Sequence, residues 1–287
     1  MEVAIISGKG GTGKSSLSAA FATQSKSVVV ADCDVDAANL YLLFNPTHEE
    51  EQVYIAGQKA VINYSLCINC KLCHDYCRFD AIAIVNNKVE ISETSCDGCK
   101  LCSRICPAQA IHMENNDKSR MYSGSFRNGK MVYGRLAPGE ENSGKLVNIV
   151  REKAKNMAKA NKIETIIIDG PPGIGCAVIS SITGVNHVVI VTEPTLSGLH
   201  DLKRTVEITS KFQVKTWVVI NKFDLNTSMS AQIANYCEDA DIPVAGKIPF
   251  DPQMVEAIVN CKSISEWNST SAAAIEIKNI WSMINKK

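Results

Sequence analysis

Two sets of residues in this 287-residue chain have types and spacing suited to chemistry. The first is the run from Gly8 to Ser15, which fits the pattern G-x-x-x-x-G-K-[ST]. Its glycines let the backbone turn sharply, so that successive N–H groups point at phosphate oxygens. Lys14 is expected to reach the β- and γ-phosphates and Ser15 to ligate Mg²⁺. The predicted nucleotide contacts of this loop are Gly8, Lys9, Gly10, Gly11, Thr12, Gly13, Lys14, Ser15 and Ser16.

The second set is eight of the twelve cysteines. The spacing Cys-x₂-Cys-x₂-Cys-x₃-Cys starts at Cys67 and again 29 residues later at Cys96, and Pro107 follows the last cysteine of the second run. This pattern resembles bacterial two-cluster ferredoxins, in which the last cysteine of each repeat ligates the cluster of the other repeat. The resemblance implies two [4Fe–4S] clusters. One takes Cys67, Cys70, Cys73 and Cys106, and the other takes Cys77, Cys96, Cys99 and Cys102.

Other interpretations of these cysteines fit the spacing less well. Zinc takes four thiolates per site and does not use this triple spacing. Disulfides across two intervening residues are strained and do not persist in a reducing cytosol. Cys176 lies seven residues after Asp169, where the nitrogenase iron protein has a cluster ligand, but the second cysteine such a bridging cluster needs is missing. We therefore predict that Cys176, like Cys33, Cys237 and Cys261, is a buried core residue.

Lys9 adds a feature to the phosphate-binding loop. A lysine directly after the first glycine resembles the deviant Walker A motif of the MinD/ParA/nitrogenase-iron-protein class of dimeric ATPases. In that class the extra lysine reaches across the dimer to the nucleotide of the partner. The resemblance implies an ATP-dependent homodimer in which Lys9 and Lys14 are both catalytic.

Two further apolar runs end in aspartates. Val28–Ala31 leads into Asp32 and Asp34, and Thr165–Ile168 leads into Asp169 and a Gly-Pro-Pro-Gly turn that ends at Gly173. Strands of a parallel sheet present such residues to a ligand at their carboxyl ends. The two segments resemble switch I and switch II of the same ATPase class. The resemblance implies that Asp32 and Asp169 hold Mg²⁺ through water, Asp34 orients the attacking water, and the Gly173 amide senses the γ-phosphate.

The base-binding residues are less clear from the sequence. Asn221-Lys222-Phe223-Asp224 matches N-K-x-D, which reads guanine in GTPases, but MinD-like ATPases also carry an asparagine here that contacts adenine. Because Lys9 favours the ATPase class, we predict ATP, with Asn221 and the loop around Pro249 beside the base. GTP remains the alternative.

Strand-like and helix-like segments alternate outside the cysteine runs, which predicts an α/β fold with a mostly parallel sheet. The predicted architecture is a P-loop NTPase with an inserted two-cluster ferredoxin domain. Its boundaries are 1–60 for the first part of the ATPase domain, 61–116 for the insertion and 117–287 for the second part. A hairpin around Asn128-Gly129 and a helix from Ser143 to about Asn161 are expected in the return to the ATPase domain.

Composition excludes several classes of protein. Thirty basic residues balance thirty acidic ones, so nothing favours a nucleic-acid partner. No apolar run approaches the length of a membrane span, and the N-terminus lacks signal-peptide features, so we expect a cytoplasmic protein that does not bind membranes. The C-terminal Ile277, Ile280, Trp281 and Ile284 have helical spacing, and we expect a helix that closes the core.

These observations support three functional hypotheses. The first is a dimeric ATPase that gates electron transfer to or from a partner protein, because all eight cluster cysteines are present. The second is a carrier ATPase for assembly of iron–sulfur or metal cofactors, although the C-terminal C-x-x-C of such carriers is missing here. The third is a MinD-like positioning ATPase in which the clusters are structural.

Overall fold

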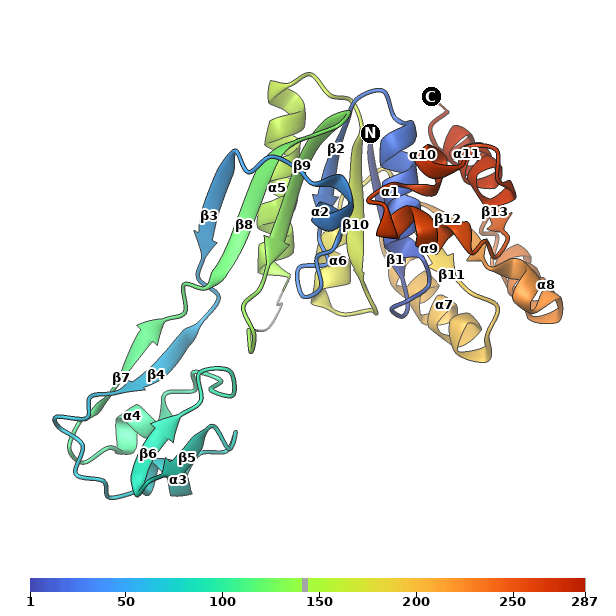
Figure 1. Ribbon diagram of the computed structural model, residues 1–287. Coiled ribbons are helices and arrows are strands. Elements are labelled where there is room, and N and C mark those ends of the chain that lie inside the picture. The colour runs from blue at the N-terminus through green and yellow to red at the C-terminus, as the bar shows by residue number, and fades with distance from the viewer. Residues whose placement is uncertain (141–143, 287) are drawn as a thin grey trace. The chain divides into compact units, whose positions relative to one another are not determined.

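The computed structural model describes residues 1–140 and 144–286 and divides into two compact units (Figure 1). We call residues 1–51, 122–134 and 142–287 the nucleotide unit, and residues 52–121 and 135–141 the cysteine-rich unit. The cysteine-rich unit begins before the predicted boundary at 61 and ends after 116, and it recruits the segment 135–141 as well. No helix within the described residues is long and apolar enough to cross a membrane.

Buried parallel strands form the centre of the nucleotide unit, as the apolar runs predict. The strands of its sheet are β1 (Glu2–Ser7), β2 (Val28–Asp32), β3 (Glu50–Tyr54), β8 (Ser119–Phe126), β9 (Gly129–Arg135), β10 (Ile166–Pro172), β11 (His187–Thr192), β12 (Lys215–Asn221) and β13 (Val244–Ile248). Their order is β13-β12-β11-β1-β10-β2-β9-β8-β3. All neighbouring pairs from β13 to β9 are parallel, so the carboxyl ends of these strands meet at one edge.

Helices pack against this sheet. They are α1 (Lys14–Gln24), α2 (Leu40–Phe44), α5 (Lys145–Ala160), α6 (Cys176–Ile182), α7 (Leu196–Thr209), α8 (Thr227–Asp239), α9 (Gln253–Val259), α10 (Ile264–Trp267) and α11 (Ala272–Ile284), with a 3₁₀ turn at Phe223–Leu225. The rings of Phe21 in α1 and Trp281 in α11 stack with centroids 4.7 Å apart. Ile277, Ile280, Trp281 and Ile284 of α11 are buried, which confirms that the last helix closes the core.

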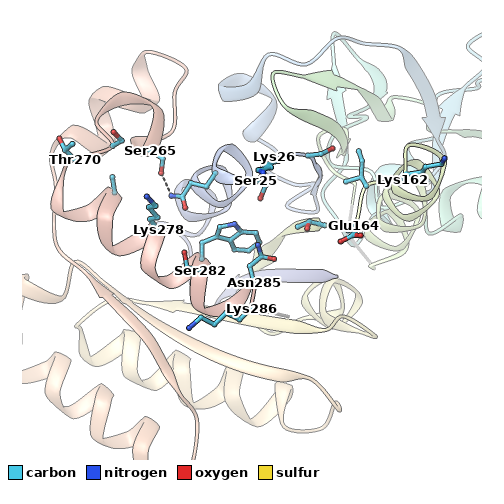
Figure 2. A pocket seen from close by; sticks show the side chains of 17 residues that line it. Ser25, Lys26, Lys162, Glu164, Ser265, Thr270, Lys278, Ser282, Asn285 and Lys286 are labelled. Carbon is cyan, nitrogen blue, oxygen red and sulfur yellow. Dashed lines mark hydrogen bonds between the residues drawn. The ribbon is translucent and has the colours of Figure 1, made fainter.

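A wide hollow lies between the end of α1 and the helix α11 (Figure 2). It is lined by Trp281 and by the lysines Lys26, Lys162, Lys278 and Lys286, and the four lysines are labelled in Figure 2. It lies beside residues 24–27 and 162–165, at the amino-terminal ends of β2 and β10. None of the residues predicted to bind nucleotide lines it, so the hollow is separate from the predicted site.

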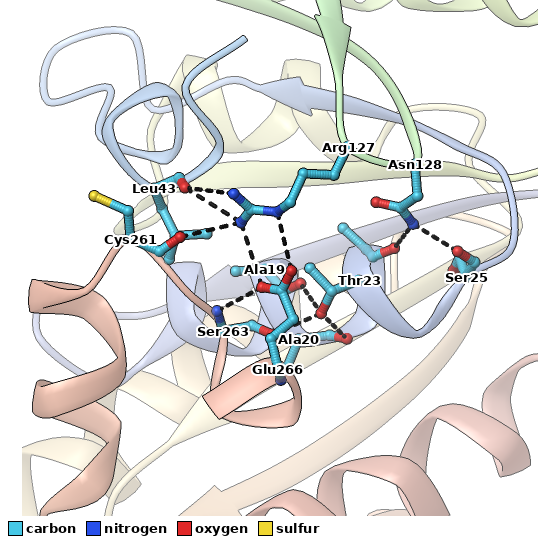
Figure 3. Close-up of polar contacts among 11 residues, drawn as sticks. Ala19, Ala20, Thr23, Ser25, Leu43, Arg127, Asn128, Cys261, Ser263 and Glu266 are labelled. Carbon is cyan, nitrogen blue, oxygen red and sulfur yellow. Dashed lines mark hydrogen bonds and ion pairs between the residues drawn. The ribbon is translucent and has the colours of Figure 1, made fainter. Parts of the chain in front are cut away.

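The predicted hairpin is present as β8 and β9, joined by Arg127 and Asn128. Arg127 holds this turn against α10, because its Nε lies 2.9 Å from Glu266 Oε1 and its Nη2 donates to the Cys261 carbonyl at 3.2 Å (Figure 3). Asn128 Nδ2 donates to the Ser25 carbonyl at 2.6 Å, at the end of α1. The hairpin is therefore fixed to the core by side chains from both of its turn residues.

The cysteine-rich unit consists of two similar halves. Its elements are β4 (Gln58–Ile62), α3 (Leu72–Asp75), β5 (Ile82–Val85), β6 (Lys88–Ile91), α4 (Leu101–Ile105) and β7 (Ile111–Asn115). β4 pairs with β7 and β5 with β6, both antiparallel. Residues with positive φ recur at the 29-residue offset of the cysteines: Asn69 and Gly98, Lys71 and Lys100, and Asp80 and Gln109. The duplication seen in the sequence is therefore also a duplication of the backbone.

Some local predictions differ from the structure. Helix α5 ends at Ala160, near its predicted end, whereas its predicted cap Ser143 lies outside the described residues. Cys33 and Cys237 are buried as predicted. Cys176 and Cys261 are exposed, so their assignment to the core is wrong. Cys176 opens α6 directly after the Pro-Pro turn, and Cys261 lies in the turn after α9, where the chain is at the surface.

Candidate functional site

The phosphate-binding loop connects β1 to α1 at the carboxyl edge of the sheet. Gly11 and Gly13 have φ of 79° and 93°, which side chains rarely adopt. A Cβ on Gly13 would lie 2.3 Å from Asn221 Nδ2, so only glycine fits there. That amide donates to the Thr12 carbonyl at 2.7 Å. Asn221 therefore holds the loop from the end of β12, in addition to the base contact predicted for it.

Lys14 lies among the predicted magnesium and catalytic residues. Its Nζ is 3.0 Å from Asp169 Oδ1 and 3.6 Å from Asp34 Oδ2. Ser15 Oγ donates to the other oxygen of Asp169 at 2.7 Å. Burial alone would lower the pKa of Lys14, but the carboxylates, Asp169 first, outweigh it and raise that pKa above 10.5. The charged lysine, the hydroxyl and two carboxylates thus converge from three segments of the chain, as the motifs predict.

Asp32 fixes the turn after β2. Its Oδ1 accepts from the amide of Asp34 at 3.2 Å, and its Oδ2 accepts from the amides of Asn39 and Leu40 at 3.2 and 3.1 Å. Burial, followed by the negative charge of Asp169, raises the pKa of Asp32 to about 8. A bound divalent cation would favour the ionised carboxylates, so this donor set of hydroxyl and carboxylate oxygens fits Mg²⁺.

Lys9 is held within its own chain. Its Nζ lies 2.5 Å from Glu193 Oε1 and 3.1 Å from Ser197 Oγ. Glu193 also faces Lys222, whose Nζ is 3.6 Å from Oε2. Sequence reasoning missed Glu193, although it directly follows the carboxyl end of β11, where a parallel sheet places its ligand residues. The acid therefore gathers two lysines beside the phosphate-binding loop.

The predicted base region is held together by Asp224. Its Oδ1 accepts from the amide of Phe250 at 2.7 Å and so connects the N-K-x-D segment to the loop that contains Pro249. Asn221 Oδ1 accepts from the amide of Lys222 at 3.0 Å. One oxygen of the aspartate that would read guanine is thus engaged by the protein backbone. The segment and the loop lie together, as expected for the two sides of a base site.

Gly173 has a φ of 91°, and its amide donates to the Ser7 carbonyl at 2.8 Å. The amide predicted to sense the γ-phosphate is thus bonded to the strand that leads into the loop. A hollow between the loop and the two switch segments is lined by residues 10–16, Asp34, Asn39, Pro171 and Pro172. A nucleotide triphosphate placed there would meet the loop amides and both switch segments.

In the cysteine-rich unit, two hollows separate the eight motif cysteines into two sets. One hollow is lined by Cys67, Cys70, Cys73 and Cys106. The other is lined by Cys77, Cys96, Cys99 and Cys102, and also by Cys73, which therefore lines both hollows. Each hollow thus contains the four ligands predicted for one cluster, including the cysteine contributed by the opposite repeat. All cysteines of the described residues are free thiols.

The chemistry of these hollows fits an iron–sulfur cluster. Apart from the cysteines, most of their wall residues are apolar, with Ala60, Ala81 and Ile111 among them. Burial raises the pKa of Cys102 to about 11, with a further contribution from the neighbouring Cys96. Such thiols become thiolates when they coordinate a metal. No three His, Cys, Asp or Glu side chains of the described residues converge on a single-ion site. The four cysteines predicted for each cluster would be its thiolate ligands.

The fold and the phosphate-binding site define a P-loop nucleotide-binding protein. Residues 3–264 match the family described as the CobQ/CobB/MinD/ParA nucleotide-binding domain. Because the match spans most of the chain, the protein belongs to this family of MinD/ParA-like ATPases. This confirms the superfamily and the mostly parallel α/β fold that the sequence predicted.

Relatives and solved structures agree with this assignment. Protein MJ0578 of Methanocaldococcus jannaschii is 37% identical over 279 residues, which cover 96% of this chain and 94% of that protein. Protein MJ0579 of the same organism is 28% identical over 312 residues and covers 98% of each chain. The septum site-determining protein MinD of Pyrococcus horikoshii, solved with Mg-ADP, has a TM-score of 0.59 at 18% identity and covers 99% of this chain and 96% of that one. At that identity the likeness is one of fold.

Proposed function

We propose that the protein is a homodimeric MgATPase that couples hydrolysis to electron transfer, through two [4Fe–4S] clusters, to or from a partner protein. The observation that carries this proposal is the pair of hollows, each lined by the four cysteines of one predicted cluster. All eight ligands are present in one chain, which suits a resident electron carrier better than a donor of clusters. Bound clusters would supply one-electron transfer.

In this proposal the residues of the nucleotide site have different roles in ATP hydrolysis. Lys14 binds the β- and γ-phosphates, and Ser15, with Asp32 and Asp169 through water, holds Mg²⁺. Asp34, whose pKa is raised by burial, orients and deprotonates the attacking water. Adenine is the preferred base because the MinD neighbour is solved with Mg-ADP. It would lie between Asn221 and the loop at Pro249.

In the proposed dimer, Lys9 would contact the nucleotide of the partner subunit. Its ion pair with Glu193 occupies it in the single chain, so the lysine must leave that acid to reach the nucleotide of a partner subunit. The Gly173 amide likewise must leave the Ser7 carbonyl to reach a γ-phosphate. Binding of ATP would therefore exchange contacts within one chain for contacts with the triphosphate, which links the nucleotide state to the conformation of both switch segments.

The decisive experiment starts from protein purified without oxygen. Iron and sulfide are counted, and the ATPase rate is measured with the protein oxidised and reduced by dithionite. We expect eight irons per chain, two clusters of four, and a rate that differs between the two redox states. An equal rate in both states would contradict coupling. Transfer of iron to an apo-ferredoxin would instead favour the assembly carrier.

Cysteine variants test the crossed ligand sets. Cys106→Ser should weaken the cluster held with Cys67, although Cys106 belongs to the second repeat. Cys77→Ser should weaken the other cluster. Electron paramagnetic resonance of the reduced variants distinguishes the two clusters, and Cys237→Ser, a buried cysteine outside the repeats, is the control. If each variant lost the cluster of its own repeat, the crossed assignment would be wrong.

A further inference from the structure

The duplicated halves of the cysteine-rich unit provide each residue with a counterpart 29 positions away. Lys59 on β4 corresponds to Lys88 on β6, and Cys67 corresponds to Cys96. Both lysines lie on the strand that precedes their cysteine run. The two halves have a similar backbone conformation. Differences between the surroundings of the two lysines therefore show what each half binds.

Lys59 is buried, with only 9% of its side chain exposed. Its Nζ donates to the carbonyl of Cys96 at 2.6 Å and to that of Gly139 at 3.2 Å. Glu140 Oε1 lies 3.8 Å away and also accepts from Asn116 Nδ2. The ammonium thus joins the cluster-binding loop of the second repeat to the segment 137–140 of the same unit.

The segment lies close against the second repeat. Gly139 has a φ of 77°, and a Cβ there would be 2.2 Å from the Thr94 carbonyl, two residues before Cys96. Residues 137–140 form a turn in which the amide of Glu140 donates to the Ala137 carbonyl at 3.1 Å. This turn shows what the place accepts, because it presents a carbonyl and a carboxylate to Lys59. In the second repeat, residues 137–140 of the chain itself occupy this position beside the cluster-binding loop.

In the first repeat the same place is open. The side chain of Lys88 is exposed, and its ammonium has no hydrogen-bond or ion-pair partner among the described residues. It lines a groove together with Tyr64, Asn69 and Asn87, and Cys67 forms part of the wall. Cys67 is the counterpart of Cys96, so the groove corresponds to the position that the segment 137–140 covers in the other half.

The surroundings of the two places also differ in polarity. In the first repeat Tyr64, Leu66 and Ile68 are exposed by 56%, 52% and 67%. Their counterparts in the second repeat are Glu93, Ser95 and Asp97. An apolar rim around a cationic groove is typical of a surface that a protein partner covers, because burial of the rim adds free energy to the ionic contact.

We propose that this groove docks an acidic turn of a partner protein, which presents a carbonyl and a carboxylate to Lys88 as Gly139 and Glu140 do to Lys59. The inference rests on the proposed function, and it specifies that the partner meets the cluster held by Cys67. The contact is a charge-assisted hydrogen bond, and the partner segment takes an acidic residue after a small one.

The test uses a fluorescein-labelled peptide with the sequence of residues 135–140 of this chain, Arg-Leu-Ala-Pro-Gly-Glu. Its fluorescence anisotropy is measured against the full-length holoprotein without oxygen. We expect saturable binding that weakens roughly tenfold in Lys88→Met, since one charge-assisted hydrogen bond is lost. A peptide ending in Gln should bind as weakly to the wild-type protein.

Lys26→Met is the control, because it removes an exposed lysine that lines neither the groove nor a cysteine hollow, and it should leave binding unchanged. Failure of the peptide to bind the wild-type protein at millimolar concentration would overturn the inference, as would equal binding to Lys88→Met. Iron content and ATPase rate are measured on the same samples. Loss of binding with eight irons retained contradicts only the docking site, whereas protein without iron contradicts the proposed function beneath it.

Discussion

The Lys14 ammonium and the Asp169 carboxylate lie 3.0 Å apart at the carboxyl edge of the sheet, although they are far apart in the sequence. Asp169 is fully buried and Lys14 is nearly so. The pair connects the phosphate-binding loop to the second switch segment before any nucleotide is bound. Binding of a triphosphate must therefore compete with this contact for the lysine.

Lys14→Ala is expected to destabilise the fold as well as abolish nucleotide binding. The substitution leaves the buried Asp169 carboxylate without its positive partner, which costs about 3–5 kcal/mol of unfolding free energy. Urea unfolding and binding of a fluorescent ATP analogue measure the two effects. Lys14→Met with unchanged stability would show that the carboxylates are protonated or solvated.

Lys9→Ala should reduce ATP hydrolysis by the dimer and leave the stability of the fold nearly unchanged. The Lys9 side chain is 30% exposed and pairs with Glu193 near the surface, so we expect a change in stability below about 1 kcal/mol. Hydrolysis should fall by about 100-fold or more, because a cation at the transferred phosphate is lost. Steady-state ATPase assays and light scattering with ATP check this. A variant that hydrolyses ATP at the wild-type rate would exclude the role across the dimer.

Gly98→Ala should remove one cluster and spare the other. Gly98 has a φ of 70°, and a Cβ would lie 2.1 Å from the Gln58 carbonyl. The strain, of order 1–3 kcal/mol, falls on the loop that carries Cys96 and Cys99. Iron analysis should show a loss toward about four irons per chain, one cluster. Asn69→Gly, at the equivalent position with a φ of 55°, is the control and should retain both clusters.

The stability of the protein should depend on pH through His187. Burial, and then the charge of Lys215, lowers the pKa of His187 in the folded state. Its Nδ1 accepts from Trp217 Nε1 at 3.2 Å, which requires the neutral ring. This contribution to stability is complete above the unfolded pKa of about 6.5 and is lost as pH falls through the lower folded pKa.

Thermal unfolding of wild type and His187→Gln at pH 8 and pH 5.5 measures this dependence. Glutamine keeps an acceptor for the indole and does not titrate. Between pH 8 and pH 5.5, the melting temperature of the wild type should fall further than that of the variant. Equal losses would show that other groups set the pH dependence.

Much of this molecule follows from local patterns in the sequence. The loop at Gly8–Ser15, the strands that end at Asp32 and Asp169, and the duplicated cysteine runs are each specified by residues close together in the chain. Their meeting at one sheet edge follows from the parallel order of the strands. The 29-residue repeat likewise predicted two similar halves, which the paired φ angles confirm.

Contacts between distant segments were not predictable in this way. Glu193 holds Lys9, and Lys59 binds the segment 137–140. Neither Glu193 nor Lys59 belongs to a recognisable motif. The exposure of Cys176 and Cys261 depends on how turns reach the surface, whereas residue type alone suggested burial. Such features depend on tertiary packing, which spacing in one sequence does not encode.

The edge strand β3 and its neighbour β8 show where the cysteine-rich segment leaves and rejoins the sheet. The amides of Thr47 and Glu49 donate to the carbonyls of Ser125 and Ser123, so the polypeptide leaves the sheet and comes back along an antiparallel neighbour. The exit near Tyr54 and the return near Ser119 therefore face each other across a single ladder. A short turn would close that gap, so the cysteine-rich segment between β3 and β8 stands in the chain where a hairpin turn would be sufficient.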